Sequence, residues 1–207
     1  MKKKIIITIL IIILIIPLLY YLVPKKTYTN KDFNIPDIKS TIDYNNNGID
    51  DYTDIHDGAV LYIKTKPKYK SKYYNTGYPN DNYGVCTDVV AFAFKNAGYD
   101  LQTLVDNDIN NHKERYNIDK PDKNIDFRRV KNLKIFFDNN STILTNNINN
   151  YSEFQKGDIV IFPKHIAIIS EKRNKKGIPY IIHNNGNHRY IEDALTRYKI
   201  IGHYRWK

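Results

Sequence analysis

The sequence predicts an α+β fold, with helices packed on a small antiparallel sheet behind an N-terminal transmembrane helix. Three observations predict it: a charge-free apolar segment near the start, helical periodicity in the middle of the chain, and short apolar strands towards its end. Because the helices come before the strands and short turns separate the strands, the sheet is expected to be antiparallel.

Residues 5–23 carry no charged side chain and follow three lysines at positions 2–4. As a helix this segment would be roughly 28 Å long, close to the hydrocarbon thickness of a bilayer. The lysines favour a cytoplasmic N-terminus, and the small residues of a signal-peptidase site are missing after Val23. We therefore expect residues 1–23 to be an uncleaved single-pass anchor in the cell membrane, with the remaining domain extracellular.

The chain has 32 Lys and Arg against 22 Asp and Glu, a net charge of +10. Outside a cell this charge suits anionic membrane surfaces or wall polymers. The basic residues are scattered and form no recognition motif, which argues against a nucleic-acid partner. Residues 24–42 contain two prolines and few apolar side chains, so they predict a linker to one monomeric domain.

Residues 43–54 place oxygen-bearing side chains at the spacing of an EF-hand loop, with Gly48 at its sixth position. They resemble the calcium loops of dockerins. The expected ligands are Asp43, Asn45, Asn47, Ile49 through its carbonyl, Asp51 and Asp54. The calcium would be structural, with no cofactor for catalysis; the alternative is an Asn- and Asp-rich turn that binds no metal.

Three helices are expected in the middle of the chain. The first begins at Cys86 and ends at Gly98, which suits a C-terminal cap. Asp100 is placed to cap the second helix, and Asp126 the third. Apolar residues recur with helical spacing at Cys86, Val89, Val90, Ala93, Phe94 and Ala97, at Leu101, Leu104, Val105 and Ile109, and at Phe127, Val130, Leu133 and Phe137.

The last fifty residues change to the pattern of strands. Residues 156–158 predict a turn, and strands are expected at 159–162, 165–170, 180–183 and 200–206. Residues 163–164 and 174–177 connect the first three strands, and residues 146–150 predict a surface loop. The first three strands therefore form a meander that brings the ends of neighbouring strands together.

Cys86 is the only cysteine, so it has no partner for a disulfide in an exported chain. In the first turn of a helix its thiol would lie among unpaired N–H groups, which stabilise a thiolate. A nucleophilic thiol also needs a base and a group that orients the base. The alternative is a buried cysteine that acts only as a small apolar side chain.

The base and its orienting group are expected on the meander. His165 opens one strand and His183 ends the next, so neighbouring strands can place them about 5 Å apart at Cβ. We expect His165 to face Cys86 and His183 to hold His165. Asn184 is the alternative third residue, because adjacent strand residues point to opposite faces.

Four further residues are candidates for substrate binding. Asp88 either caps the cysteine helix or tunes the thiol, and Tyr83 is placed to add a hydroxyl. Arg128 and Arg129 are candidates for a bidentate clamp on a substrate carboxylate, or else an ion-paired helix start. The backbone N–H of Cys86 is a natural donor to an oxyanion.

Taken in order, these segments resemble the NlpC-type, papain-like cell-wall hydrolases. The likeness is carried by the cysteine helix, Gly157–Phe162, His165–Ile168 and Ile181–His183. A closer likeness, to an exported bacterial family of unassigned function in that superfamily, covers residues 55–207. It is carried by Gly84-Val85-Cys86-Thr87-Asp88, Asn124-Ile125-Asp126-Phe127-Arg128-Arg129-Val130, His183-Asn184 and Gly202-His203-Tyr204. Val85-Cys86-Thr87 departs from the Asp-Cys-Ser that is usual in the superfamily.

The resemblance implies a papain-like fold over residues 55–207 and a cysteine peptidase or amidase with a Cys86–His165–His183 triad. It also implies peptidoglycan stem peptides in the cell envelope as the substrate. Two alternatives remain: a catalytically silent wall-binding module of the same fold, and an acyltransferase or thioesterase-like enzyme.

Overall fold

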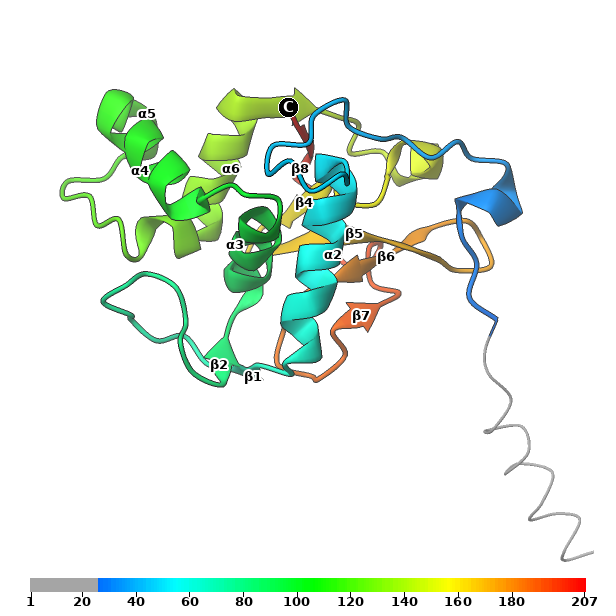
Figure 1. The fold of residues 1–207 in the computed structure, drawn as a ribbon, viewed down its shortest axis with the longest axis horizontal. Helices are drawn as coiled ribbons and strands as arrows, with labels where there is room; N and C mark the ends of the chain where they lie inside the picture. Colours follow the sequence, from blue (N-terminus) through cyan, green and yellow to red (C-terminus); the bar gives the residue numbers. More distant parts are fainter. Residues whose placement is uncertain (1–25) are drawn as a thin grey trace, which may run out of the picture.

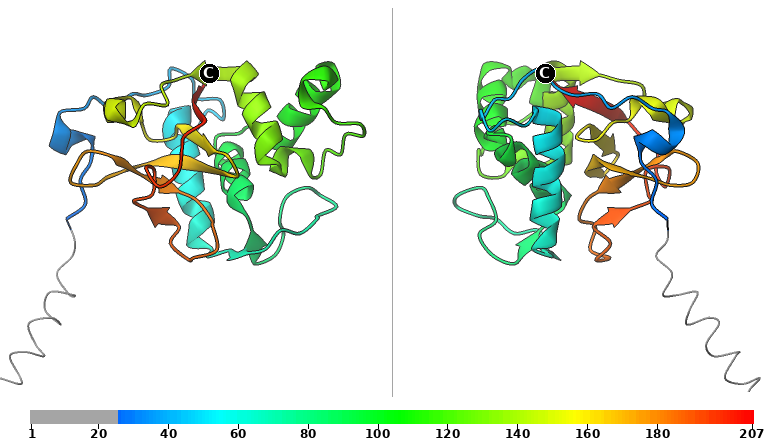
Figure 2. Two further views of the ribbon diagram at one scale, coloured as in Figure 1. Left: turned by 180° about the vertical axis from the view of Figure 1, so that it is seen from behind. Right: turned by 45° about the vertical axis from the view of Figure 1, so that its right-hand side comes forward.

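A layer of helices covers one face of a β-sheet in the computed structural model, which describes residues 26–207 (Figure 1). The second view of Figure 2 separates the helices from the strands. The α-helices are α2 (Asp51–Lys64), α3 (Cys86–Asn96), α4 (Leu101–Asn111), α5 (Lys113–Tyr116) and α6 (Val130–Asn140). Three 3-10 helices accompany them: η1 (Asn30–Phe33), η2 (Asp126–Arg128) and η3 (Ile148–Glu153).

The sheet has six strands in the order β3-β8-β4-β5-β6-β7, and all neighbours are antiparallel. Its strands are β3 (Ser141–Ile143), β4 (Ile159–Phe162), β5 (His165–Arg173), β6 (Pro179–Ile182), β7 (Ile191–Glu192) and β8 (Gly202–Trp206). A separate parallel pair joins β1 (Lys68–Tyr69) to β2 (Tyr83–Gly84), directly before the cysteine helix. The meander β4-β5-β6 is the predicted one.

The structure corrects the predicted fold class. It shows an α+β fold whose antiparallel sheet has six strands within residues 26–207 instead of the four that were expected, because β3 and β7 add the two edges. None of the helices within residues 26–207 is long and apolar enough to cross a membrane. The predicted anchor, residues 1–23, lies outside the described residues.

Most of the predicted helices and strands are present. Gly98 ends the α3 segment with φ of +88°, and the Asp100 carboxylate caps α4 by accepting from the Gln102 N–H. The helix expected from Asp126 is split into η2 and α6, because Arg129 between them is extended. The loop expected at 146–150 is occupied in part by η3.

Helix α2 is the main element that the sequence did not predict. Asp50 caps it by accepting from the Thr53 N–H, so the helix begins inside the predicted calcium loop. The predicted domain boundary between residues 54 and 55 therefore falls within one helix. Helix α2 packs along α3 and buries Ile55 and Ala59 completely.

Strand alternation divides the core into two parts. The helix-side core joins α2, α3 and α4 to Ile166, Ile168 and Ile182 of the sheet. The far-side core lies on the opposite face and contains Phe154, Val160, Phe162, Ala167, Ile169, Ile181, Ala194 and Leu195. A residue of β5 or β6 therefore belongs to one face or the other according to its position in the strand.

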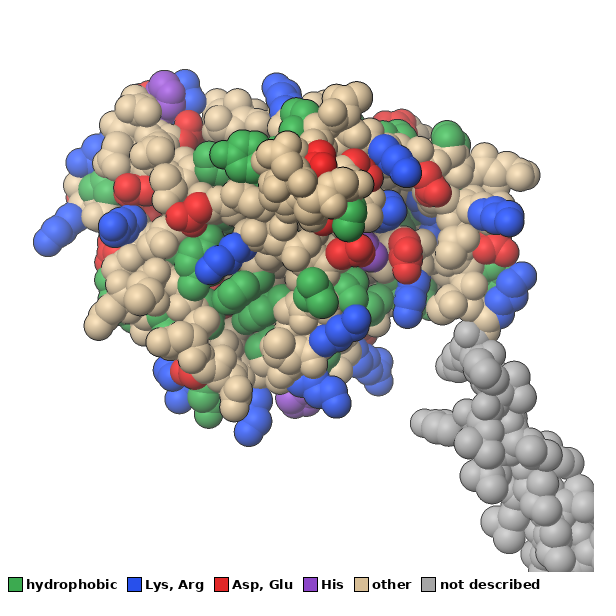
Figure 3. Space-filling view, in the orientation of Figure 1, with side chains coloured by type: hydrophobic (Ala, Val, Ile, Leu, Met, Phe, Trp, Pro, Cys, Tyr) green, Lys and Arg blue, Asp and Glu red, His purple; other side chains and the backbone are tan. Residues whose placement is uncertain are grey.

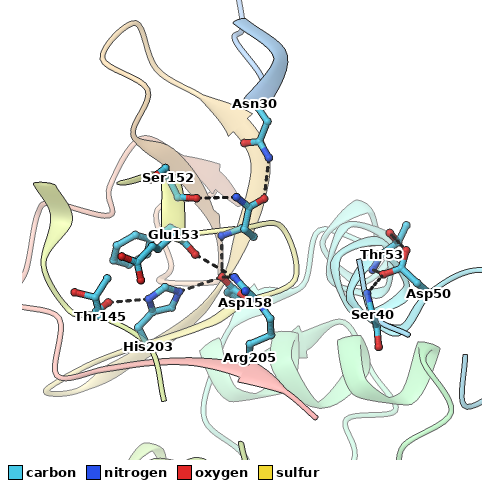
Figure 4. Close-up of polar contacts among 12 residues, drawn as sticks. Asn30, Ser40, Asp50, Thr53, Thr145, Ser152, Glu153, Asp158, His203 and Arg205 are labelled. Atoms are coloured by element: carbon cyan, nitrogen blue, oxygen red, sulfur yellow. Dashed lines mark hydrogen bonds and ion pairs between the residues drawn. The ribbon is translucent and has the colours of Figure 1, made fainter. Parts of the chain in front are cut away.

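Part of the predicted linker, residues 24–42, is docked on the domain. Tyr28 and Arg173 exchange two backbone hydrogen bonds, of 3.2 and 2.7 Å. The Asn30 amide donates to the Gln155 side chain at 2.8 Å (Figure 4). Ile35 is also buried, so residues 28–35 belong to the folded domain.

The Gly157-Asp158 turn, which comes directly before β4, is hydrogen-bonded to side chains of β8. Gly157 has φ of +85°, and a Cβ there would lie 2.2 Å from the Tyr52 carbonyl oxygen, so only glycine fits. The buried Asp158 carboxylate accepts from His203 Nε2 at 3.1 Å and from Arg205 Nε at 2.7 Å (Figure 4). This polar cluster is structural, because Asp158 and His203 are fully enclosed.

Candidate active site

Cys86 occupies the first turn of α3, as predicted, and lies in the helix-side core. Burial raises the pKa of its thiol to about 11, although the backbone N–H groups of Ile166, Thr87 and Cys86 itself favour the thiolate. The expected thiolate is therefore not the resting state of this structure. The loss of solvation outweighs the favourable position at the helix start.

His165 and His183 lie side by side, as the meander predicts. Nε2 of His165 is 2.8 Å from Nδ1 of His183, and the rings meet edge to face with centroids 5.0 Å apart. Burial lowers the pKa of His165 to about 4, and the neighbouring His183 adds to the shift. Burial also lowers the pKa of His183. Both rings are consequently neutral near pH 7.

The thiol and the histidine pair approach β5 from different faces. Alternation places His165 with Ala167 on the far side of the sheet, whereas Cys86 packs on the helix side. Among residues 26–207, no hydrogen bond joins the thiol to the His165 ring; its polar contact on β5 is the N–H of Ile166. Cys86 and the histidine pair are thus neighbours along β5 without direct contact.

Glu192 of β7 extends the histidine pair. Its Oε2 lies 3.3 Å from His183 Nε2, an ion-pair contact without the alignment of a good hydrogen bond. Arg197 donates to both carboxylate oxygens, at 2.7 and 3.2 Å, and these bonds lower the pKa of Glu192 to about 2. Glu192 could not be predicted from the sequence, because only the pairing of β6 with β7 brings it onto the face that His183 occupies.

A cavity of about 500 Å³ opens beside the histidines. His165 and His183 form part of its wall, and Lys164 and Lys199 also line it. The remaining lining residues are Tyr69, Phe162, Pro163, Ile181, Asn185, Ala194 and Tyr198. The cavity therefore offers apolar surface, two cations and the candidate base to a bound molecule.

Asp88 and Arg128 form a buried ion pair. Arg128 donates from Nε to Asp88 Oδ1 at 2.6 Å and from Nη2 to Asp88 Oδ2 at 3.0 Å. Asp88 also caps α3 by accepting from the Val85 N–H, and Arg128 donates to the Lys72 carbonyl. Arg129 is exposed. Of the two alternatives for Arg128, the structure therefore shows the ion-paired helix start, because its guanidinium is committed to Asp88 and to the Lys72 carbonyl.

Asn184 and Tyr83 flank the cysteine without joining the histidine pair. The buried Asn184 amide donates to the carbonyls of Pro67 and Gly84, at 2.9 and 3.1 Å, and so ties the end of β6 to β1 and β2. His183, the preceding residue, is the one that holds His165. Tyr83 is half-buried, and Lys72 lies over its ring at 4.9 Å.

Residues 56–206 match the family described as "Domain of unknown function (DUF1287)". The chain belongs to this family. It is also 34% identical over 165 residues to "Uncharacterized protein YijF" of Escherichia coli strain K12, covering 73% of this chain and 80% of that protein. No solved structure matches the chain. Neither likeness links this DUF1287 member to NlpC-type hydrolases, so the papain-like part of the predicted fold class is not retained.

The predicted calcium loop lies before the part of the chain that matches DUF1287. Its side chains are engaged with one another: Asp43 accepts from the Gly48 N–H, and Asp54 accepts from the Asn45 and Asn47 amides. Asp51 accepts from the Tyr99 hydroxyl, and Ile49 is exposed. No group of three His, Cys, Asp or Glu within residues 26–207 is arranged to hold a metal. Calcium binding here stays a prediction, which thermal unfolding in calcium against EGTA tests.

Proposed function

We propose that this DUF1287 protein is a cysteine hydrolase that cleaves amide bonds, with Cys86 as nucleophile and His165 as base. The observation that carries the proposal is the packing of the thiol against the N–H of Ile166, the residue next to His165. His165 in turn is hydrogen-bonded to His183 and lines a cavity. A buried thiol and two buried imidazoles are costly in solvation, and such perturbed groups gather at functional sites.

In the proposed reaction, His165 takes the thiol proton and the Cys86 sulfur attacks the carbonyl carbon of the substrate. The C–N bond then breaks, and the leaving amine takes the proton from His165. The thioester that remains is hydrolysed by water. The N–H of Cys86 stabilises the oxyanion from the start of α3. Because the two groups approach β5 from different faces, this step requires the His165 ring to turn towards the thiol at the start of the strand.

The cavity favours a substrate with an apolar part and an anionic group. Phe162 and Ile181 supply apolar wall, while Lys164 and Lys199 supply positive charge. Lys and Arg side chains are otherwise spread among acidic ones on the face drawn in Figure 3. Peptidoglycan stem peptides of the cell envelope, which the NlpC-type resemblance suggests, carry carboxylates and remain part of the proposal, as does export.

The test uses the full-length chain in detergent with purified cell wall and synthetic stem peptides. Wild type and His188→Asn should release fragments, and Cys86→Ala and His165→Gln should not. His188 is an exposed histidine with φ of +59°, which asparagine tolerates, so it controls for the loss of a histidine. Equal behaviour of Cys86→Ala and wild type would contradict the proposal.

A second candidate is a binding module without turnover. The buried, protonated thiol and the missing Cys86–His165 hydrogen bond favour it. Alkylation separates the two candidates. A hydrolase should alkylate more slowly at pH 7 in His165→Gln, whereas a binding module should react at the same rate in both forms, following the thiol pKa alone. Transfer of a trapped acyl group to an amine instead of water would indicate an acyltransferase.

A further inference from the structure

We infer that Glu192 is a positioning residue that sets the tautomers of two histidines in series and leaves Nδ1 of His165 free to accept a proton. That Nδ1 of His165 takes its proton from the Cys86 thiol rests on the proposed function. The assignment of the two tautomers does not depend on that function, because it follows from the contacts of β5, β6 and β7.

Glu192 is held as a carboxylate. Its side chain is buried, and Arg197 donates to both of its oxygens. Arg189 lies 3.7 Å from Oε1, and the Asn187 amide donates to Oε2 at 3.4 Å. Cations and donors therefore surround the group, and an ionised carboxylate can only accept hydrogen bonds.

The proton positions follow from this charge. His183 Nε2 faces the Glu192 carboxylate at 3.3 Å, and a backbone hydrogen bond to Arg189 also favours a protonated ring nitrogen, so Nε2 carries the proton of the neutral ring. Nδ1 of His183 then has the lone pair. The 2.8 Å contact requires one donor, so Nε2 of His165 carries the proton. Nδ1 of His165 is left with a lone pair and is the base.

Without the carboxylate, the opposite arrangement becomes available. Nδ1 of His183 can then donate to Nε2 of His165, and Nδ1 of His165 would carry the proton. A protonated Nδ1 on a neutral ring cannot accept a second proton easily. Glu192→Gln favours this arrangement, because Arg197 holds the amide oxygen and turns the amide N–H groups towards His183 Nε2.

The experiment is long-range ¹H–¹⁵N NMR of the full-length chain in detergent, labelled at its six histidines. Histidine-to-glutamine variants assign the signals. In wild type at pH 7, both His165 and His183 should show the Nε2–H tautomer. In Glu192→Gln, both should shift to the Nδ1–H tautomer. The control is Asp193→Asn, which removes the same charge from the next, exposed residue and should leave both tautomers unchanged.

A wild-type spectrum with a proton on Nδ1 of His165 overturns the inference even if Glu192→Gln does not fold. Unchanged tautomers in a folded Glu192→Gln overturn it as well. Alkylation of Cys86 at pH 7 is measured in parallel, and Glu192→Gln should slow it about a hundredfold, the scale of general-base catalysis. If the tautomers are as assigned but His165→Gln alkylates like wild type, the proposed function fails while the positioning role of Glu192 stands.

Discussion

The buried histidines make the stability of the protein depend on pH. The pKa of His165 falls to about 4 in the folded chain against 6.5 for a free imidazole, and that of His183 falls as well. The unfolded chain therefore binds more protons between these values. The free energy of unfolding is therefore not reduced by these histidines above pH 6.5, and it falls as the pH is lowered towards 4. Thermal unfolding should show a lower midpoint at pH 5 than at pH 7, with a smaller difference in His165→Gln than in His188→Asn.

The ion pair of Asp88 and Arg128 should be one of the most sensitive points of the fold. Both side chains are almost wholly buried, so removing one leaves the other charged without a partner. Asp88→Asn or Arg128→Gln should lower the free energy of unfolding by about 3–5 kcal/mol in urea titration. Arg129→Gln, at the exposed neighbour, should change it by less than about 0.5 kcal/mol. Equal effects at the two arginines would contradict the burial of the pair.

The sequence predicts most of the polar residues of the site but not all of their partners. The contact between His165 and His183 follows from strand spacing alone. Glu192 does not, because its strand has two residues and only its pairing with β6 aligns it with His183. For Arg128 the sequence left a substrate clamp and an ion pair open, since periodicity cannot reveal that its partner is Asp88, forty positions away in the chain.

At the scale of elements, the approach of α2 to β2 depends on a glycine. A Cβ on Gly84 would lie 2.0 Å from the Tyr62 hydroxyl, which is buried and has no hydrogen-bond partner among the described residues. Gly84→Ala should therefore destabilise the protein by about 1–3 kcal/mol through overpacking. Tyr62→Phe removes the obstructing oxygen and should by itself be nearly neutral.

The double variant Gly84→Ala with Tyr62→Phe tests this contact. Most of the lost stability should return in chemical unfolding, because the next ring atom of Tyr62 would lie 3.3 Å from the new Cβ. Additive effects of the two substitutions would show that the strain lies elsewhere.

The elements that were predicted share strong local signals. Helix α3 has a full apolar face and a closing glycine, β4 is a continuous apolar run, and β5 contains such a run at residues 166–169. Helix α2 was missed because its first turn, with Asp51 and Asp54, also fits a calcium loop. Strands β3 and β7 have three and two residues, too few for a period to show.

At the scale of the whole molecule, the N-terminal segment before the family domain is part of the fold. Arg173 is fully buried and donates to the Asn30 side chain and to the carbonyls of Tyr151, Phe154 and Gly177. Asn30 is thus the side chain through which residues 28–35 contact this buried cation. The composition of the segment suggested a linker, because few of its side chains are apolar. The segment is held mainly by polar hydrogen bonds of Asn30 with Gln155 and Arg173, which no apolar pattern can reveal.

Asn30→Ala should release this segment without unfolding the domain. The Arg173 guanidinium keeps its three carbonyl acceptors, whereas the segment loses its side-chain bonds to Gln155 and Arg173. Limited trypsin digestion of the full-length chain should therefore cut faster at Lys31 in Asn30→Ala than in wild type. The midpoint of thermal unfolding should change little. Asn139→Ala, at an exposed asparagine of α6, serves as the control and should be cut like wild type. Unchanged cleavage at Lys31 in Asn30→Ala would mean that the backbone pairing of Tyr28 with Arg173 suffices to hold the segment.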